Sequence, residues 1–408
     1  MERFLRLGLP SMRDETWRYT DLRSLAARSF VDAPQTMPGE VVPGASQSLL
    51  GDTSGAATVL MINGYPILSG SSFSPINGIE INGLQKLSRT NPKLVLPYLE
   101  TSSDADQRRW SLLNTALFVD GLHLKIDGKV AAPLLILHVA AGNGANNAAY
   151  PRVIIEASPG ASATIIEHHV SQHEHASLCN SATHLALETG AQIEHYRVFS
   201  TGPAATHVDS LDVRQGKDSR CKQFTFVLGG GLVRAGLESH LDRAGACLES
   251  YSLLVGHEAR HVDCLNIVTH AAPDTCSRQT ARAIASGTSR VIFNSKVVVN
   301  PGAMHAESQQ SSRGLLLSPT AEIDTRPQLE IHADEVKCAH GATTGRLDPD
   351  MLFYMLSRGL DRETAQSLLV YAFLADVLTG MSVPAARSAI EGALIAQLPD
   401  SQVLRKFR

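Results

Sequence analysis

The sequence is poor in aromatic residues, and it has no long apolar run. Only 5% of its 408 residues are Phe, Trp or Tyr although 43% are hydrophobic, so small and β-branched side chains must fill most of the core. That composition favours thin, stacked β layers. No apolar run approaches the roughly 18 residues that a membrane-spanning helix needs. The first residues lack a long apolar segment, so we expect no signal peptide and a cytoplasmic protein.

Closely spaced cysteines are also missing, and no charge of one sign dominates. The six cysteines are Cys179, Cys221, Cys247, Cys264, Cys276 and Cys338, and no CxxC motif occurs. Scattered cysteines predict reduced thiols rather than a disulfide framework. They also argue against a self-contained structural zinc site or a ferredoxin motif. The net charge of −4 gives no electrostatic reason to expect nucleic-acid binding.

The usual catalytic signatures are absent as well. The sequence contains no GxxxxGK[ST], so it does not bind nucleotide through a P-loop. It contains no GxSxG, HExxH or HxE…CxxC, so the common hydrolase and deaminase motifs are missing. The motifs therefore give no support to a P-loop nucleotide-binding protein or to the common hydrolases and deaminases.

What the sequence does contain is a β-rich repeat between about residues 119 and 340. Short bursts typical of strands, such as VIIEA and RVIFNSKVVV, are separated by turns. A Gly-Ala pair recurs at Gly160-Ala161, Gly190-Ala191, Gly245-Ala246 and Gly302-Ala303. The intervals are about one, two and two units of roughly 28 residues, and a fixed period of this size is typical of a solenoid. Units made only of strands favour a β-helix, with an irregular β-sandwich as the alternative.

These patterns predict three regions. A mixed N-terminal domain covers residues 1–118, with a Pro-, Gly- and Ser-rich linker at 31–56; a β-helix core covers 119–347; a helical domain covers 348–408. In the last region Asp348 and Asp361 are predicted helix N-caps. The segment 368–378 (LLVYAFLADVL) is apolar almost all round, so its helix is either packed between neighbours or docked on a partner. At the other end, Trp17 is expected to anchor the N-terminal segment on the body.

Cys338 and His340 are the best candidates for chemistry. They lie in the segment 329–348 (LEIHADEVKCAHGATTGRLD) and are the closest Cys/His pair in the chain. Two residues apart on a strand, a thiol and an imidazole point to the same face. Such ligands suit iron, zinc or copper. Two ligands do not complete a tetrahedral site, so the others must come from elsewhere in the chain or from another chain. The alternative for Cys338 is a small buried apolar side chain.

Two further groups of histidines occur in the β-rich region. One comprises His168, His169, His173 and His175 in EHHVSQHEH. The other comprises His257, His261 and His270, around Cys264. The first group falls at a predicted turn, so we expect a solvated loop rather than a metal site. The second group lies on successive predicted strands, so we expect a structural role.

Six segments resemble the SufB/SufD family, the scaffold proteins of the SUF iron–sulfur cluster assembly system. They are RDETWRYTDL (13–22), LNTALFVDGLHL (113–124), RVIIEASPGASATIIEHH (152–169), RVIFNSKVVV (290–299), LLLSPTAEIDTRPQLEIHADEVKCAHGATTGRLD (315–348) and LFYMLSRGL (352–360). The first segment and the KCxHGATxGxLD block are similar to the SufD branch rather than to SufB. The sequence departs from the family at Gln310-Ser311-Ser312, where Gln-x-Asn is common, and at His332, where an aromatic residue is common.

The resemblance implies a mainly β fold, with a right-handed parallel β-helix core and N-terminal and C-terminal helical domains. It implies a non-catalytic scaffold subunit that pairs with SufB through the β-helices and holds the ABC-type ATPase SufC on its C-terminal domain. A transient iron–sulfur cluster at the SufB interface is implied, with His340 as a ligand and Cys338 beside it. A flavin in the complex is a further cofactor expectation. The predicted SufC-docking residues are Leu368, Leu369, Phe373 and Leu374.

Two alternatives stay open at this point. β-helices also host secreted carbohydrate-active enzymes, which use clustered acids on one face. The acids that such an enzyme would use here are Asp209, Asp212, Glu238 and Asp242. Their spacing does not place them clearly on one face, and the expected lack of a signal peptide speaks against secretion. The second alternative is a homodimeric scaffold that acts alone.

Overall fold

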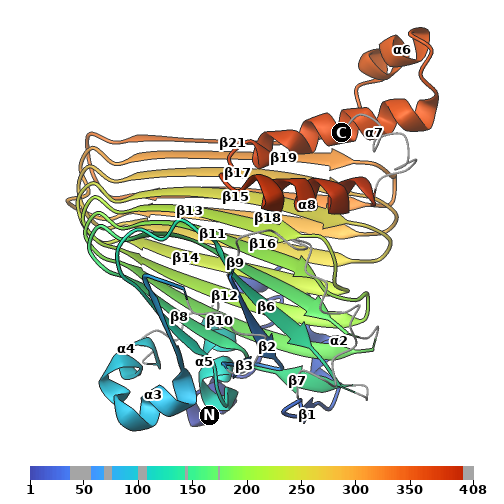
Figure 1. The fold of residues 1–408 in the computed structure, drawn as a ribbon. Coiled ribbons are helices and arrows are strands. Elements are labelled where there is room, and N and C mark those ends of the chain that lie inside the picture. Colours follow the sequence, from blue (N-terminus) through green and yellow to red (C-terminus); the bar gives the residue numbers. More distant parts are fainter. Residues whose placement is uncertain (37–56, 69–75, 100–107, 143–145, 173–174, 398–408) are drawn as a thin grey trace.

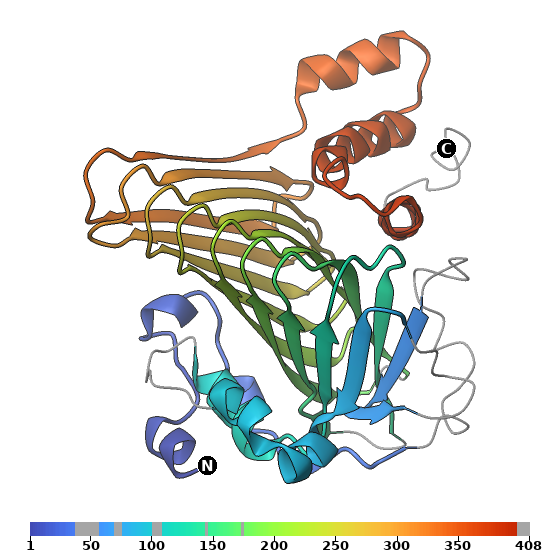
Figure 2. The same cartoon turned by 60° about the vertical axis from the view of Figure 1, so that its left-hand side comes forward.

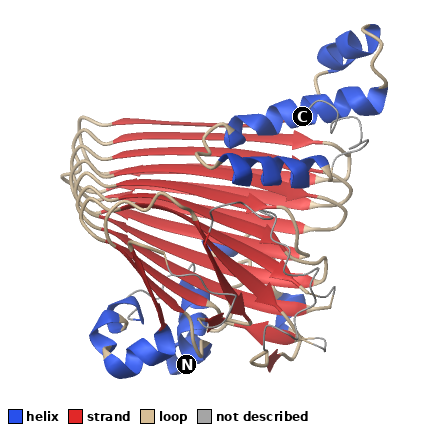
Figure 3. Cartoon of the chain, in the orientation of Figure 1, coloured by secondary structure: helices blue, strands red, loops and turns tan. Residues whose placement is uncertain are grey.

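The chain folds as a parallel β-solenoid with helices at both ends, as the computed structural model shows for residues 1–36, 57–68, 76–99, 108–142, 146–172 and 175–397 (Figures 1 and 3). Each coil gives one strand to each of two sheets, and strands of successive coils pair side by side. The predicted class, a parallel β-helix core with terminal helices, is confirmed.

Two sheets, here called sheets A and B, run the length of the solenoid. The strands of sheet A are β1 (Val31–Asp32), β4 (Ile79–Gly83), β5 (Leu122–Ile126), β7 (Asn147–Ala149), β8 (Arg152–Ala157), β10 (Ser177–Leu187), β12 (Ala205–Gln215), β14 (Leu232–Leu241), β16 (His261–His270), β18 (Arg290–Val299) and β20 (Glu322–Ile331). The strands of sheet B are β2 (Ala57–Ile62), β3 (Tyr65–Ile67), β6 (Leu134–Ala140), β9 (Ser162–Ser171), β11 (Gln192–Ser200), β13 (Arg220–Val227), β15 (Cys247–Gly256), β17 (Cys276–Ala285), β19 (Glu307–Leu316) and β21 (Lys337–Arg346).

The sheets begin upstream of residue 119. Strand β2 pairs with β6 in parallel, and β4 pairs with β5 in antiparallel fashion, so residues before 118 extend both sheets. The predicted linker at 31–56 lies outside the described residues from position 37 onward.

The Gly-Ala pairs form corners of the solenoid. Gly160, Gly190, Gly245 and Gly302 have positive φ angles of 69°, 69°, 73° and 84°. Glycine suits this left-handed conformation because it has no Cβ, and the alanine that follows each of them is fully buried at the bend. At the corners between them the left-handed residue is Asp218 (φ 55°) or Asp274 (φ 57°). Because Asp also tolerates this conformation, the Gly-Ala pair appears at only some coils.

The interior between the sheets has an apolar zone and a polar zone. Leu134, Ile165 and Ile193 belong to a large apolar cluster that runs through successive coils. Beside this cluster lie buried polar side chains, such as Arg197 on β11 and Asp209 on β12, which form an ion pair. Buried charge is tolerated where it is paired and hydrogen-bonded. The interior therefore contains buried ionisable side chains as well as an apolar core.

The N-terminal helices are α1 (Glu2–Leu7), η1 (Glu15–Trp17), α2 (Arg23–Ala26), α3 (Leu84–Thr90), η4 (Pro92–Leu94), α4 (Leu96–Leu99) and α5 (Arg109–Leu117). Trp17 is buried against Trp110 and the outer face of sheet A, with the Arg234 guanidinium 4.4 Å from its ring centroid. The predicted anchoring role of Trp17 is therefore confirmed. No helix in the described part of the chain is long and apolar enough to cross a membrane.

One expectation about the cysteines is wrong. Cys247 on β15 and Cys276 on β17 form a disulfide, with their Cα atoms 4.6 Å apart. The two residues are 29 positions apart and occupy the same register position on neighbouring coils. Without the coil register, a separation of this length gives no sign of contact. The other cysteines, Cys179, Cys221, Cys264 and Cys338, are free.

Candidate functional site at the open end of the solenoid

The last coil of the solenoid is exposed on its outer side. Strands β20 and β21 stand at the ends of sheets A and B, and each pairs with one neighbour only. Figure 2 shows this coil as the orange strands farthest from the N-terminal helices. The apolar core reaches it, because Leu329, Val336 and Cys338 pack partly buried on the interior cluster. Ile331, at the end of β20, is 42% exposed. An unpaired edge with exposed apolar core is a surface suited to pairing.

Cys338 and His340 lie on β21, as predicted, and share its inward face. The register aligns Cys338 with Ser308 of β19, and His340 with Gln310. Ser308 and Gln310 are buried, whereas the thiol is half-buried and His340 is exposed, because no described strand lies above them. The geometry therefore presents a thiol and an imidazole side by side at the rim of the open coil.

His340 ends a ladder of polar side chains that runs up the interior of sheet B. Below it, at the same register position on successive coils, lie His195, Gln223, Ser250, Gln279 and Gln310. The side-chain oxygen of Gln310 is buried, and it has no hydrogen-bond partner among the described residues. An acceptor in that position, directly next to His340 along the sheet, suits an imidazole N–H.

At the rim of the open coil, Cys338 is half-buried and two glutamates lie in ion pairs. Burial raises the pKa of the Cys338 thiol, so the thiol holds its proton until a metal displaces it. On the solvent side, the Lys337 ammonium lies 2.7 Å from Glu307. Glu330 accepts hydrogen bonds from Lys296 and His332, which lower its pKa to about 2. Glu307 and Glu330 are thus each paired with a lysine.

The open coil alone does not supply enough ligands for a metal centre. In the part of the chain that the structure describes, three groups of at least three metal-ligating side chains come together, and none contains Cys338 or His340. The open coil therefore offers two candidate ligands, Cys338 and His340, and a complete metal centre there would need further ligands from elsewhere.

Sequence reasoning misplaced one group of histidines. His168 and His169 lie within β9 and are 1% and 2% exposed, so the expected solvated loop is wrong for them. His175 is exposed beyond the strand, and His173 lies outside the described residues. The prediction failed because the end of β9 is polar, and a run of polar residues is more typical of a turn than of a strand. The repeat gives the missing signal, because His138 lies one coil before His169 and pairs with it in register.

The other histidine group is structural, as predicted, but its placement on successive strands is wrong. His261 and His270 stand at the two ends of one strand, β16, and His257 precedes it. His270 is buried and lies within hydrogen-bond distance of Thr275 and Ser277. His261 contacts Thr20 of the N-terminal segment, and His257 is exposed in a turn. These contacts explain the residues as structural.

The acids considered for a carbohydrate-active enzyme are divided between two environments. Asp209 is buried inside the solenoid and pairs with Arg197. Asp212 and Glu238 lie next to each other on the outer face of sheet A, where Arg108 reaches both, and Asp242 lies 3.8 Å from Arg214. These acids do not converge on one catalytic centre.

The C-terminal domain follows the open coil and consists of α6 (Pro349–Ser357), α7 (Arg362–Leu378) and α8 (Pro384–Ile395). Asp348 and Asp361 cap α6 and α7 through their side chains, as predicted. Helices α7 and α8 lie against the outer face of sheet B, over the stacked rings of Tyr196, Phe224 and Tyr251 (Figure 1).

The predicted docking residues differ in their exposure. Leu374 is fully buried between α7 and sheet B, where it attaches the helix to the body. Leu368 and Phe373 are partly buried against the same cluster, and Leu369 is half-buried. The most exposed apolar side chains of the domain lie on α6, where Phe353 is 72% exposed. Figures 1 and 2 show α6 standing away from the sheets.

Comparison with known proteins gives matches over nearly the whole chain. The model described as "SUF system FeS cluster assembly, SufBD core domain" matches residues 139–373, and the SufBD protein N-terminal region matches residues 1–134. The iron–sulfur cluster assembly protein SufD of Escherichia coli is 28% identical over 404 residues, which cover 98% of this chain and 92% of the relative. A SufBD family protein of Synechocystis is 28% identical, with 91% and 84% covered. Bacillus subtilis SufD is 25% identical, with 75% and 71% covered.

Proposed function

The chain belongs to the SufBD family of iron–sulfur cluster assembly proteins, and on that premise we propose that it is a non-catalytic scaffold subunit of the SUF system. In this proposal it pairs with SufB, binds the ATPase SufC, and helps to assemble and transfer clusters in the cytoplasm. The observation that carries the proposal is the open coil. There, Cys338 and His340 face inward at an unpaired edge with too few ligands for a centre of their own.

The open coil supports pairing with a second β-helix. Its edge strands offer unpaired backbone groups, and its partly covered core offers apolar area that a partner coil would bury. A partner docked there would bring its own ligands next to Cys338 and His340. A nascent cluster, as the cargo of the complex, would then be held between the two subunits.

His340 is the cluster ligand in this proposal, with Cys338 beside it. A ligating imidazole is usually oriented by a hydrogen bond from its other ring nitrogen. The buried side-chain oxygen of Gln310, which lies at the next register position, suits that role. Gln310 would therefore be a positioning residue.

The C-terminal domain is the proposed SufC site. Leu368, Leu369 and Phe373 are partly exposed on α7, and α6 presents a more exposed apolar surface next to them. Leu374 acts indirectly, because it holds α7 on sheet B. ATP-driven dimerisation of SufC would move these helices as a rigid body and thereby change the interface at the adjoining open coil. A homodimer of this chain and a flavin in the complex remain predictions.

The test is co-expression of the untagged partners with a tagged chain under anaerobic conditions. We expect a stable complex with SufB and SufC. In that complex, His340→Ala should lower cluster content and cluster delivery at least about tenfold while the subunits still co-purify. The matched control is His332→Ala, since His332 is a half-exposed histidine of the same coil, paired with Glu330. Wild-type cluster delivery by the His340→Ala complex would exclude the ligand role, and failure to recover either partner would exclude the assembly.

A further inference from the structure

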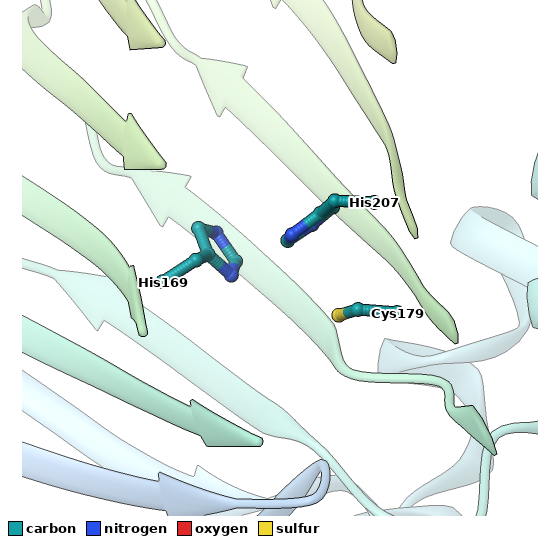
Figure 4. Close-up of side chains that lie close together, drawn as sticks. All are labelled: His169, Cys179 and His207. Atoms are coloured by element: carbon teal, nitrogen blue, oxygen red, sulfur yellow. The ribbon is translucent and has the colours of Figure 1, made fainter. Parts of the chain in front are cut away.

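A second cluster of metal-ligating side chains lies inside the solenoid, several coils away from the open end. Figure 4 shows His169, Cys179 and His207 with their side chains directed toward one another. His169 comes from β9 of sheet B, whereas Cys179 and His207 come from β10 and β12 of sheet A. The register pairs Cys179 directly with His207, and His169 faces them across the interior. The fold thus brings together residues from three strands and both sheets.

The spacing of the three donor atoms is compatible with one bound ion. One ligand atom of each residue lies within 4.8 Å of the other two. Donors that share a tetrahedral ion, at about 2.0–2.3 Å from it, lie roughly 3.5 Å apart. Binding an ion would therefore require the donor atoms to draw closer by side-chain rotation. The imidazole rings of His169 and His207 meet edge to face, with centroids 4.7 Å apart.

The buried ring nitrogens lack the partners that packing alone would require. Neither nitrogen of His169 has a hydrogen-bond partner among the described residues, nor does Nδ1 of His207. Buried polar atoms in native proteins are nearly always satisfied, so three such nitrogens in one place need an explanation. The His169 ring is held flat between His138 and Phe199, with centroids 4.2 and 5.1 Å away.

The hydrogen bonds around His207 define which of its nitrogens can bind a metal. The Ser181 hydroxyl donates to Asp209 Oδ1 at 2.5 Å, so it can only accept from His207 Nε2, 2.8 Å away. Because the neutral ring has one N–H, Nδ1 then carries a lone pair. An imidazole fixed through one nitrogen, with the other unprotonated, is the usual arrangement of a metal ligand.

The space at this position matches a single ion. His138, His169, Cys179 and His207 line a cavity of about 20 Å³. A cavity needs about 10–15 Å³ to hold one water molecule, so this one accepts an ion or a water and no organic ligand.

The charge of the surroundings favours a divalent cation. Glu167 is buried next to the cluster, and a ligand atom of His169 lies within 4.8 Å of its carboxylate. Its carboxylate oxygens lie 3.0 Å from His138 Nε2 and 2.9 Å from His195 Nε2. A carboxylate beside the three donors, together with the thiolate that Cys179 would become on binding a metal, suits a divalent cation.

We propose that His169, Cys179 and His207 bind one divalent transition-metal ion of the Zn²⁺ or Fe²⁺ class inside the solenoid, next to the Glu167 carboxylate. Two imidazoles and a thiolate select such ions over Mg²⁺ or Ca²⁺. The ion would join sheet A to sheet B across the early coils and would satisfy the buried nitrogens. This site is independent of the proposed cluster role of the open coil.

The test uses the full-length untagged chain with Cys338→Ser and His340→Ala, so that the open coil cannot contribute a signal. Cobalt(II) is added without oxygen as the probe, because a cobalt–thiolate bond gives an intense charge-transfer absorption. We expect one equivalent to bind with that absorption and to be displaced by Zn²⁺. Cys179→Ser should abolish the band, and His207→Gln should weaken binding at least about tenfold. Cys264→Ser, which changes a buried interior cysteine elsewhere in the solenoid, is the control and should keep the band.

Two outcomes would overturn the site. They are the absence of the charge-transfer band in the parent chain and its persistence in Cys179→Ser. X-ray absorption on the Zn²⁺-loaded parent needs no variant, so it stays decisive if the substitutions impair folding. It should show one sulfur at about 2.3 Å and two imidazole nitrogens at about 2.0 Å, and a shell without sulfur would contradict the proposal. Metal analysis of the parent as purified distinguishes zinc from iron as the natural occupant.

Discussion

Several buried ionisable side chains of the solenoid make stability depend on pH, and His270 is the clearest case. It is fully buried on β16, with its ring nitrogens 2.8 Å from Thr275 Oγ1 and 2.9 Å from Ser277 Oγ. Burial lowers the pKa of His270 to about 4, because the charged ring would lose its hydration. The unfolded chain takes up this proton near pH 6.5, whereas the folded chain does so only near pH 4.

We predict that the free energy of unfolding falls as the pH drops from about 6.5 to 4. Below pH 6.5 the unfolded state binds more protons, so each such histidine removes up to about 1.4 kcal/mol per pH unit until its folded pKa is reached. His270→Gln should make this decline shallower by about that amount. Urea unfolding at a series of pH values measures the slope. His257→Gln, at an exposed position, is the control, and an unchanged slope in His270→Gln would disprove the prediction.

Single residues show where sequence reasoning succeeds and where it fails. The alternation of a strand was enough to place Cys338 and His340 on one face, because that relation is local. It could not reveal that His169, Cys179 and His207 meet, because their contact depends on coil register. The strands of sheet B recur at intervals of 27 to 31 residues. Because the corner lengths vary, the sequence alone does not tell which residues of successive coils are paired.

Helices α6 and α7 are both apolar, but only α7 packs against the solenoid. α7 buries Val370, Leu374 and Val377 against sheet B, so these side chains contribute to folding. α6 has no buried residue, and it exposes Met351, Phe353 and Tyr354. Several exposed apolar side chains on one helix are typical of an interaction surface.

We predict that α6 and α7 respond differently to substitution. Phe353→Ser should change the free energy of unfolding by less than about 0.5 kcal/mol, because the ring is largely exposed, but should reduce SufC binding at least about tenfold. Leu374→Ala should instead cost about 2–4 kcal/mol by leaving a cavity. Urea unfolding and a SufC pull-down on both variants give the comparison. Full SufC binding by Phe353→Ser would exclude α6 as the docking helix.

The sequence predicts where α6 and α7 begin, but not what α7 packs against. Asp348 and Asp361 accept hydrogen bonds from the first turns of α6 and α7, and capping chemistry of this kind is written in neighbouring residues. The segment 368–378 is apolar almost all round, which leaves both packing and partner docking open. Only the tertiary structure shows that one side of α7 covers the aromatic ladder of sheet B.

The two ends of the solenoid are covered differently. At the N-terminal end, antiparallel strands β3 and β4 stop the parallel ladder, and helices pack beside them. At the C-terminal end, within the described residues, β20 and β21 leave their outer edges unpaired. A repeat protein normally needs a polar terminal repeat to keep its core from solvent. The 28-residue period predicted the coils, but it holds no information on how the last one is covered.

The exposed core of the last coil therefore predicts where subunits join. Ile331→Glu would place a charge at the rim, where burial by a partner coil would require desolvating it. We expect the dissociation constant of the SufB complex, and of any homodimer, to rise at least about tenfold. Val119→Glu changes an apolar residue of similar exposure outside this rim and should have no such effect. Sedimentation velocity with each variant measures association. Equal loss in both variants would point to a general defect, and retained association in Ile331→Glu would move the subunit interface away from the open coil.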